Sequence, residues 1–239
     1  TTGLVLDPYF SATKFEWLLT EGAVVADDNL RLGTVDAWLL WKLTGGAVHA
    51  TEPSNASRTM LFDLRTGGWS PDLCERFSVP IAALPEIRST SGRFGTTTNG
   101  GPVPVGVPVS GMAGDQQAAL FGQACFTAGA AKNTYGTGSF VLINLGPELP
   151  TPVDGLLNTV AWQLGDAESM TYALEGSIFS TGAMVQWLRD ELGLISKAAE
   201  LGPLAESVEN SAGVVFVPAF AGLGSPWWDP WARGTIVGL

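Results

Sequence analysis

The stretch from Ser110 to Phe140, SGMAGDQQAALFGQACFTAGAAKNTYGTGSF, constrains the fold more than any other part of the chain. Its Gly-Asp-Gln step leads into an alanine-rich run, which predicts a helix that begins near Asp115. The residues on either side of Gly136-Thr137-Gly138 read as two β-strands joined by that turn. A helix followed by paired strands within so short a span indicates an α/β protein.

Two groups in this stretch have the chemistry for moving a phosphoryl group onto a hydroxyl. The Asp115 carboxylate, with the Gln116 amide beside it, could accept a proton from an alcohol. The turn glycines would let phosphate oxygens approach backbone N–H groups, and the Thr137 hydroxyl would add a donor. Each feature also has a purely structural explanation, because aspartate at a helix start is a common N-cap and Gly-Thr-Gly is an ordinary hairpin turn.

The overall composition narrows the class of protein. With 239 residues, 46% of them hydrophobic and 15% charged, the chain can bury a real core and is not disordered. A net charge of −11 argues against nucleic acid as a partner, because backbone binding needs an excess of Lys and Arg. No apolar run reaches membrane-spanning length, and the amino end lacks the features of a signal peptide.

Cysteine and histidine usage excludes several kinds of site. Cys74 and Cys125 are far apart and flanked by apolar residues, so we expect two buried free thiols in a reducing cytoplasm. His49 is the only histidine in the chain, which argues against a histidine-rich metal site and against a Ser-His-Asp triad.

The order of predicted elements suggests two α/β lobes. Helices are expected over residues 12–20, 35–43, 71–77 and 181–192 and near 203–208, with N-caps at Ser11, Thr34, Ser70 and Ser180. Strands are expected over residues 107–110, 130–135, 139–145, 157–164, 169–174 and 214–218. The change from helix-rich to strand-rich sequence falls near residues 122–129, where we place the boundary between the lobes.

Two further features allow more than one interpretation. Gly182 and Gln186 lie one turn apart on the expected helix over 181–192, and a glycine in its first turn suggests a close approach either by a ligand or by another helix. The tryptophans of GLGSPWWDPWARG could form a sugar-stacking platform. They could equally pin a long loop to the core, with Asp229 and Arg233 paired across it.

Seven segments resemble the FGGY family of carbohydrate kinases, in the family's order and over the whole chain. They are YFSATKFEWLLTE, GTVDAWLLWKLTGG, SNASRTMLFD, GMAGDQQAALFGQ, KNTYGTGSF, ALEGSIFSTGAMVQWLRDEL and GLGSPWWDPWARG. An ordered set of this kind is highly specific. The Asp-Gln-Gln-Ala-Ala form favours the branch that acts on glycerol over the sugar kinases of the family.

The resemblance implies an actin-like, ribonuclease H-like two-lobed ATPase fold that closes on ATP, Mg²⁺ and glycerol. Residues 1–122 would form the later part of the first lobe, and residues 123–239 the first part of the second. The glycerol pocket would be lined by Tyr9, Asp115, Gln116 and Phe140, with Asp115 as the base. The nucleotide side would contain Thr137, Gly138, Gly182 and Gln186. No metal ligand is assigned, and the complete enzyme is expected to be a cytoplasmic homo-oligomer that makes sn-glycerol 3-phosphate.

Several segments of the family pattern have no match in this sequence. The first phosphate-binding loop, an Arg-Glu pair and a tryptophan for glycerol, and the adenine-binding region have no counterpart in this sequence. We therefore interpret the chain as a central fragment that would be inactive alone. Some bacterial relatives bind fructose bisphosphate through a glycine loop ending in Arg; here Pro102, Pro104 and Gly106 occupy that region, so this regulation is not expected.

Three alternatives remain open at this stage. The scaffold could serve a kinase for another polyol or sugar of the same family. A non-catalytic carbohydrate-binding module would explain the tryptophans but would predict an all-β fold, which the helical caps oppose. A structural actin-like protein would need polymerisation contacts that no residue pattern indicates.

Overall fold

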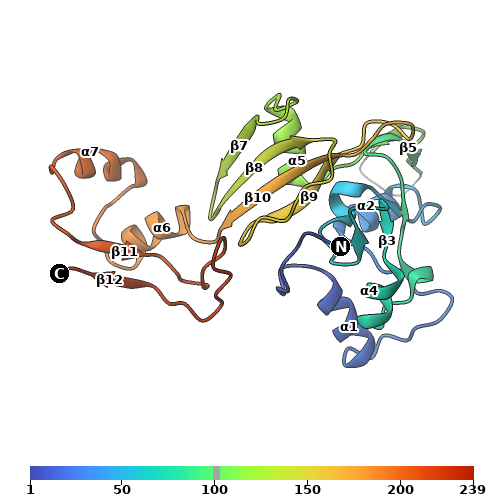
Figure 1. The fold of residues 1–239 in the computed structure, drawn as a ribbon, viewed down its shortest axis with the longest axis horizontal. Coiled ribbons are helices and arrows are strands. Elements are labelled where there is room, and N and C mark those ends of the chain that lie inside the picture. Colours follow the sequence, from blue (N-terminus) through green and yellow to red (C-terminus); the bar gives the residue numbers. More distant parts are fainter. Residues whose placement is uncertain (99–102) are drawn as a thin grey trace. The chain divides into compact units, whose positions relative to one another are not determined.

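The computed structural model describes residues 1–98 and 103–239, and Figure 1 traces the chain from its amino end in blue to its carboxyl end in red. Pro102, one of the residues in the loop considered for bisphosphate binding, lies outside the described residues. The helices are α1 (Ala12–Thr20), α2 (Val35–Leu43), α3 (Pro53–Ala56), α4 (Pro71–Arg76), α5 (Asp115–Gly122), α6 (Gly182–Asp190) and α7 (Leu201–Glu206), with 3₁₀ turns η1 (Ile81–Ala83) and η2 (Ala198–Glu200).

Most strands of the chain are short and pair locally. The strands are β1 (Ala50–Thr51), β2 (Phe62–Asp63), β3 (Gly68–Trp69), β4 (Glu86–Ile87), β5 (Ser91–Thr96), β6 (Pro108–Gly111), β7 (Ala131–Tyr135), β8 (Ser139–Gly146), β9 (Leu157–Trp162), β10 (Thr171–Ile178), β11 (Val215–Val217) and β12 (Thr235–Val237). One four-stranded sheet has the order β7-β8-β10-β9. The other sheets are the two-stranded pairs β1-β4, β2-β3, β5-β6 and β11-β12.

The chain divides into two compact units. The first unit contains residues 1–132, 142–153 and 157–174, and the second contains residues 133–141, 154–156 and 175–239. Because β7, β8 and β10 each pass from one unit into the other, the sequence boundary between the units is not a single linker.

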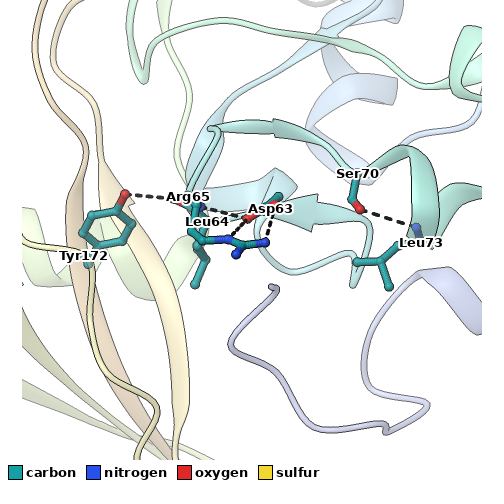
Figure 2. A network of polar contacts seen from close by, with 6 residues as sticks. All are labelled: Asp63, Leu64, Arg65, Ser70, Leu73 and Tyr172. Atoms are coloured by element: carbon teal, nitrogen blue, oxygen red, sulfur yellow. Dashed lines mark hydrogen bonds and ion pairs between the residues drawn. The ribbon is translucent and has the colours of Figure 1, made fainter.

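Clusters of buried apolar residues join the elements of the first unit. One joins Ala56, Phe62, Leu64, Val160 and Tyr172, and so brings α3 and the β2-β3 hairpin onto strands β9 and β10. The Tyr172 hydroxyl donates a hydrogen bond of 2.9 Å to the Leu64 carbonyl (Figure 2), which satisfies the polar end of a buried aromatic ring. The second cluster packs α2, β1 and β5 together through Leu40, Ala50 and Phe94.

An ion pair stabilises the turn of the β2-β3 hairpin, and a helix cap follows directly after β3. The Arg65 guanidinium lies 3.2 Å from the Asp63 carboxylate, which also accepts the Arg65 backbone N–H at 2.9 Å. The Ser70 hydroxyl accepts the Leu73 N–H at 3.4 Å at the start of α4, as Figure 2 shows. The expected cap at Ser70, with proline in the first turn, is therefore confirmed.

Of the other three expected caps, two hold their expected positions and the third is corrected by the structure. Ser11 and Thr34 occupy the N-cap positions of α1 and α2, but neither side chain makes a capping hydrogen bond. The Thr34 hydroxyl instead donates to the Asp36 carboxylate. Ser180 is not a cap, because α6 begins one residue later and Thr181 holds the cap position.

An aromatic cluster organises the second unit. The Trp187 ring on α6 lies 5.6 Å from the Phe216 ring and 5.3 Å from the Phe220 ring, measured between centroids. Phe216 belongs to β11, which pairs antiparallel with β12. These contacts place one face of α6 against the β11-β12 pair.

The tryptophan loop of this unit is held by one of its three tryptophans. The Trp228 indole N–H donates to the Gly155 carbonyl at 2.9 Å and its ring packs edge-on against Phe179, whereas Trp227 and Trp231 are exposed. The expected Asp229–Arg233 pair does not form within the described part of the chain. The Asp229 carboxylate accepts backbone N–H groups at residues 231 and 232, and the Arg233 guanidinium donates to carbonyls of the same loop.

Candidate active site

Asp115 is the first residue of α5, and its carboxylate is exposed. The N-cap position belongs to Gly114, so the explanation of Asp115 as an N-cap is wrong. The Asp115 carboxylate accepts a hydrogen bond of 3.0 Å from the side-chain amide of Gln116. A carboxylate in the first turn also interacts favourably with the positive end of the helix dipole. The structure thus presents Asp115 and Gln116 together at the start of one helix.

The start of α5 is anchored to a second helix start. The Gly114 backbone N–H donates to the Ser54 hydroxyl at 2.9 Å, and this hydroxyl donates to the Glu52 carboxylate at 2.5 Å. Glu52 is the N-cap of α3 and accepts the backbone N–H groups of Ser54 and Asn55 at 2.9 and 2.7 Å. A serine hydroxyl therefore links the caps of α3 and α5.

Glu52 is fully buried and is held by hydrogen bonds on both oxygens. Besides the hydrogen bonds already described, its carboxylate accepts the Asn55 side-chain amide of α3 at 2.9 Å and the Thr90 hydroxyl at 2.8 Å. Burial raises the pKa of Glu52 above its ordinary value, and the hydrogen bonds from Ser54, Thr90 and Asn55 oppose that rise. Such a satisfied buried group fixes the geometry around it.

The inner face of α5 is anchored by buried polar groups. The Gln117 side-chain amide donates to the Thr159 hydroxyl of β9 at 3.3 Å, and Thr159 lies 2.9 Å from the Ser57 hydroxyl. Leu120, one turn further along the same face, is completely buried. These contacts prevent α5 from rotating, so the direction of its first turn is set by the core.

Lys132 contacts the outer side of the same helix start. This lysine is the second residue of β7 and is only 3% exposed, and its ammonium group donates to the Gln116 side-chain oxygen. Lysine is rarely buried unless its charge is compensated by acceptors. Its contact with Gln116 was not anticipated from the sequence.

Tyr9 lies just before α1 and exposes nearly half of its surface. Its ring centroid is 5.6 Å from the Arg58 guanidinium carbon and 5.1 Å from the Phe10 centroid. Phe10 is buried and itself lies 5.3 Å from the same guanidinium carbon. The Tyr9 ring is thus held in place by its contacts with Arg58 and Phe10.

Three of the four residues expected on the nucleotide side, Thr137, Gly138 and Gly182, lie together in the second unit. The Gly182 N–H donates to the Gly136 carbonyl at 3.0 Å, and the Ala183 N–H donates to the Thr137 carbonyl at 3.1 Å. A Cβ atom at Gly182 would lie 2.5 Å from the Gly136 oxygen, and one at Gly138 would lie 2.4 Å from the Ile178 oxygen. The close approach suggested by Gly182 is therefore the approach of α6 to the turn itself.

Two other expected residues take different positions. Gln186 is exposed on α6, one turn after Gly182, so the two share a face of the helix. Phe140 is half-buried on β8, two residues after the turn glycine Gly138. The structure brings the turn and the start of α6 together, and leaves Gln186 further along that helix.

A cavity of about 400 Å³ lies beside α5 in the first unit. Its walls are mainly apolar and come from α5, β9 and the segment between β6 and α5, with Phe121, Trp162 and Met112 among the lining residues. Gln117 also lines this cavity, but Asp115 and Gln116 do not. The cavity is therefore separate from the polar groups at the start of the helix.

The described residues contain no helix long and apolar enough to cross a bilayer. Within residues 1–98 and 103–239, no three His, Cys, Asp or Glu side chains gather to hold a metal ion. Both cysteines are free and buried, and burial raises the pKa of the Cys74 thiol to about 11. The candidate site of the first unit thus offers a carboxylate, an amide and an ammonium group.

Comparison with known proteins identifies the family. Residues 1–122 match the N-terminal domain of the FGGY family of carbohydrate kinases, and residues 131–239 match its C-terminal domain. Over its whole length the chain is 54% identical to glycerol kinases of Bordetella parapertussis and Myxococcus xanthus, and it covers 48% and 49% of them. The chain spans about half the length of the curated relatives it matches.

Solved structures agree with this result. A glycerol kinase of Plasmodium falciparum crystallised with ADP is 40% identical and superposes with a TM-score of 0.88, over 100% of this chain and 48% of that one. A ligand-bound xylulose kinase of Lactobacillus acidophilus, 19% identical, has the same fold over 100% of this chain and 48% of its own, with a TM-score of 0.83. The expected actin-like kinase fold is confirmed, and the chain belongs to the FGGY family of carbohydrate kinases.

Proposed function

We propose that the full-length protein containing this chain is a glycerol kinase, which transfers the γ-phosphoryl group of ATP to glycerol and forms sn-glycerol 3-phosphate. The observation that carries the proposal is the exposed Asp115 carboxylate, fixed at the start of α5 with the Gln116 amide against it. Identity of 54% to glycerol kinases across the whole chain supports glycerol as the acceptor. The ADP of the Plasmodium falciparum enzyme supports ATP as the donor.

In this proposal Asp115 is the general base. Its carboxylate accepts the proton of the primary hydroxyl while the hydroxyl oxygen attacks the γ-phosphorus and the bond to the bridging oxygen breaks, leaving ADP. Gln116 holds the hydroxyl, and the rings of Tyr9 and Phe140 contact the carbon chain of glycerol. Positioning of these groups contributes more to the rate than proton transfer alone, which is typically worth about 10²–10⁴-fold.

The nucleotide side is assigned to the second unit. Thr137 and Gly138 of the turn would receive the phosphate groups, and Gly182 and Gln186 of α6 would face the nucleotide. Support comes from the contacts that join Gly182 directly to the turn, because they make the turn and the helix start one rigid element. Mg²⁺ would enter with ATP, since such ions are commonly held by substrate phosphates and only one or two carboxylates.

The lobes of the kinase are assigned from the same considerations. We assign residues 1–122 to the first lobe and residues 123–239 to the second, with Asp115 and Gln116 in the first and the phosphate turn in the second. The family matches to residues 1–122 and 131–239 support this division. Free, buried cysteines are compatible with the reducing cytoplasm in which we place the enzyme.

The test is a coupled assay of ADP formation by the full-length protein, with glycerol, dihydroxyacetone and pentuloses offered as acceptors. We expect glycerol to give the highest kcat/KM. Preference for a pentulose would instead assign the protein to a sugar-kinase branch of the family. ADP formation that is independent of every acceptor would contradict the proposed reaction.

A further inference from the structure

The buried lysine beside the candidate site has no role in the function proposed so far. Lys132 lies 16 residues from Gln116 in the chain, yet its ammonium group donates to the Gln116 side-chain oxygen. It is 3% exposed, so its charge is largely removed from water. A charge-assisted hydrogen bond in such surroundings is stronger than one between neutral groups.

The two neighbours of Gln116 require the same orientation of its amide. A lysine ammonium group can only donate hydrogen bonds, and an ionised carboxylate can only accept them. The Gln116 oxygen must therefore face Lys132, and the NH₂ group must face Asp115, as the distance of 3.0 Å between Gln116 Nε2 and Asp115 Oδ2 shows. The positions of the Gln116 side-chain oxygen and nitrogen are therefore assigned from the chemistry of their two partners and do not depend on an arbitrary choice of amide orientation.

We propose that Lys132 is a positioning residue that holds the Gln116 amide with its NH₂ group toward Asp115. The substrate hydroxyl is then recognised by one hydrogen-bond acceptor, the Asp115 carboxylate, and one hydrogen-bond donor, the Gln116 NH₂ group. This inference rests on the proposed function. Nε2 has two hydrogens, and one of them is directed at Asp115. The second is directed at a substrate oxygen placed about 3 Å from both groups.

The arrangement selects a hydroxyl group by its ability to donate and accept at once. The hydroxyl donates its proton to Asp115 and accepts the N–H of Gln116, which orients a lone pair away from the helix. An ammonium group in the same place could donate to Asp115 but could not accept from Gln116. Without Lys132, the exposed Asp115–Gln116 hydrogen bond would compete with water, and the Gln116 side chain would occupy several rotamers.

The experiment is a double-mutant cycle in the full-length protein, with kcat/KM for glycerol as the measured quantity. The variants are Lys132→Met, Gln116→Ala and the double variant, with exposed Lys197→Met as the matched control. If Lys132 acts through Gln116, Lys132→Met alone lowers kcat/KM by about 10-fold, the magnitude of one lost hydrogen bond. The double variant then loses no more than Gln116→Ala, and Lys197→Met stays at the native value.

Independent losses that multiply in the double variant, or a native kcat/KM for Lys132→Met, would overturn the inference. Because removal of either member of the pair formed by Gln116 and the buried Lys132 can prevent folding, Gln116→Glu provides a second test. A glutamate keeps an acceptor for Lys132 and removes the donor to Asp115, so we expect a loss as large as that of Gln116→Ala. Native activity of Gln116→Glu would show that Gln116 serves only as a partner for Lys132.

The failure of this inference can be distinguished from the failure of the proposed function. A native full-length protein that forms no ADP with glycerol overturns the function and the inference together. An active native protein whose variants do not follow the pattern above overturns the inference alone.

Discussion

The Gly114 N–H donates to the hydroxyl of Ser54, a residue 60 positions earlier in the chain, at 2.9 Å. This contact connects the cap of α5 to the cap of α3, because the same hydroxyl donates to the buried Glu52 carboxylate. The position of Asp115 is thus determined by a residue that does not belong to its own helix and that has no place in the proposed reaction.

Replacement of Ser54 by alanine is expected to destabilise the protein. The change leaves the Gly114 N–H and one Glu52 oxygen without this partner in a buried place, which costs about 1–3 kcal/mol of unfolding free energy. Urea denaturation measures the loss. Ser207→Ala is the control, because the Ser207 hydroxyl bonds to the Leu204 carbonyl on an exposed surface, and we expect a change within about 0.5 kcal/mol. Equal stability of the two variants would show that the link between the caps carries no free energy.

Asp115→Asn is expected to reduce turnover of the full-length enzyme by about 10²–10⁴-fold, because an amide cannot take the hydroxyl proton. KM for glycerol should change less, since asparagine has nearly the same size and still accepts a hydrogen bond. Asp72→Asn is a matched control, because Asp72 is also an exposed aspartate in the first turn of a helix. A kcat near that of the native enzyme would disprove the assignment of Asp115 as the base.

Alanine at Gly182 should disturb the contact between the turn and α6. The added Cβ atom would lie 2.5 Å from the Gly136 carbonyl oxygen, and a backbone atom cannot move away cheaply. We expect a loss of about 1–3 kcal/mol, typical of overpacking. Gly202→Ala on α7 meets no atom within 4 Å and should instead gain up to about 1 kcal/mol from helix propensity. Thermal unfolding of the two variants gives the comparison, and the opposite order of their midpoints would contradict it.

His49 should make the stability of the protein depend on pH. Burial lowers the pKa of His49 below 6.5, the nearby Arg31 charge lowers it further, and the hydrogen bond to the Leu32 carbonyl partly offsets both. Since the folded protein binds this proton less readily than the unfolded chain, the stabilisation is complete above pH 6.5 and is lost as the pH falls through the lowered pKa. The urea concentration at the midpoint of unfolding should therefore decrease as the pH is lowered below 6.5. In His49→Gln this decrease should be smaller.

A direct measurement is available for the same group. Because His49 is the only histidine of the chain, its imidazole gives a single set of ring proton signals in an NMR titration of this sequence. We expect the midpoint of the titration below 6.5. A midpoint above 6.5 would reverse the sign of the predicted stability change.

Local signals in the sequence were sufficient for most helices and for the strands from β6 to β11, whereas β3, β4 and β5 were not expected. The bounds of α1 and α2 agree with the expected ones, and the pairing of Asp115 with Gln116 follows from adjacency on one helix. The expected ends of elements agreed less well with the structure. Helix α6 ends two residues before its expected end, and β10 continues four residues beyond its expected end. Here tertiary contacts outweigh propensity.

The parts of the site that sequence reasoning missed depend on tertiary contacts. Glu52 and Lys132 look like ordinary charged residues in the sequence, and only folding buries them and brings them to Thr90 and Gln116, respectively. Pro53 was the one available signal for the start of α3, because proline is favoured in the first turn of a helix. Trp227 and Trp228 illustrate the same limit, since adjacent identical residues differ in exposure once the loop is folded.

The direction of three consecutive side chains on α5 has a consequence for how this protein could be altered. Gln117 seats the helix against Thr159, whereas Asp115 and Gln116 do not contribute to that seat. The place of α5 against β9 is therefore set from position 117, so a substitution at position 115 can change the chemistry at this end of the helix while the helix keeps its position against the core.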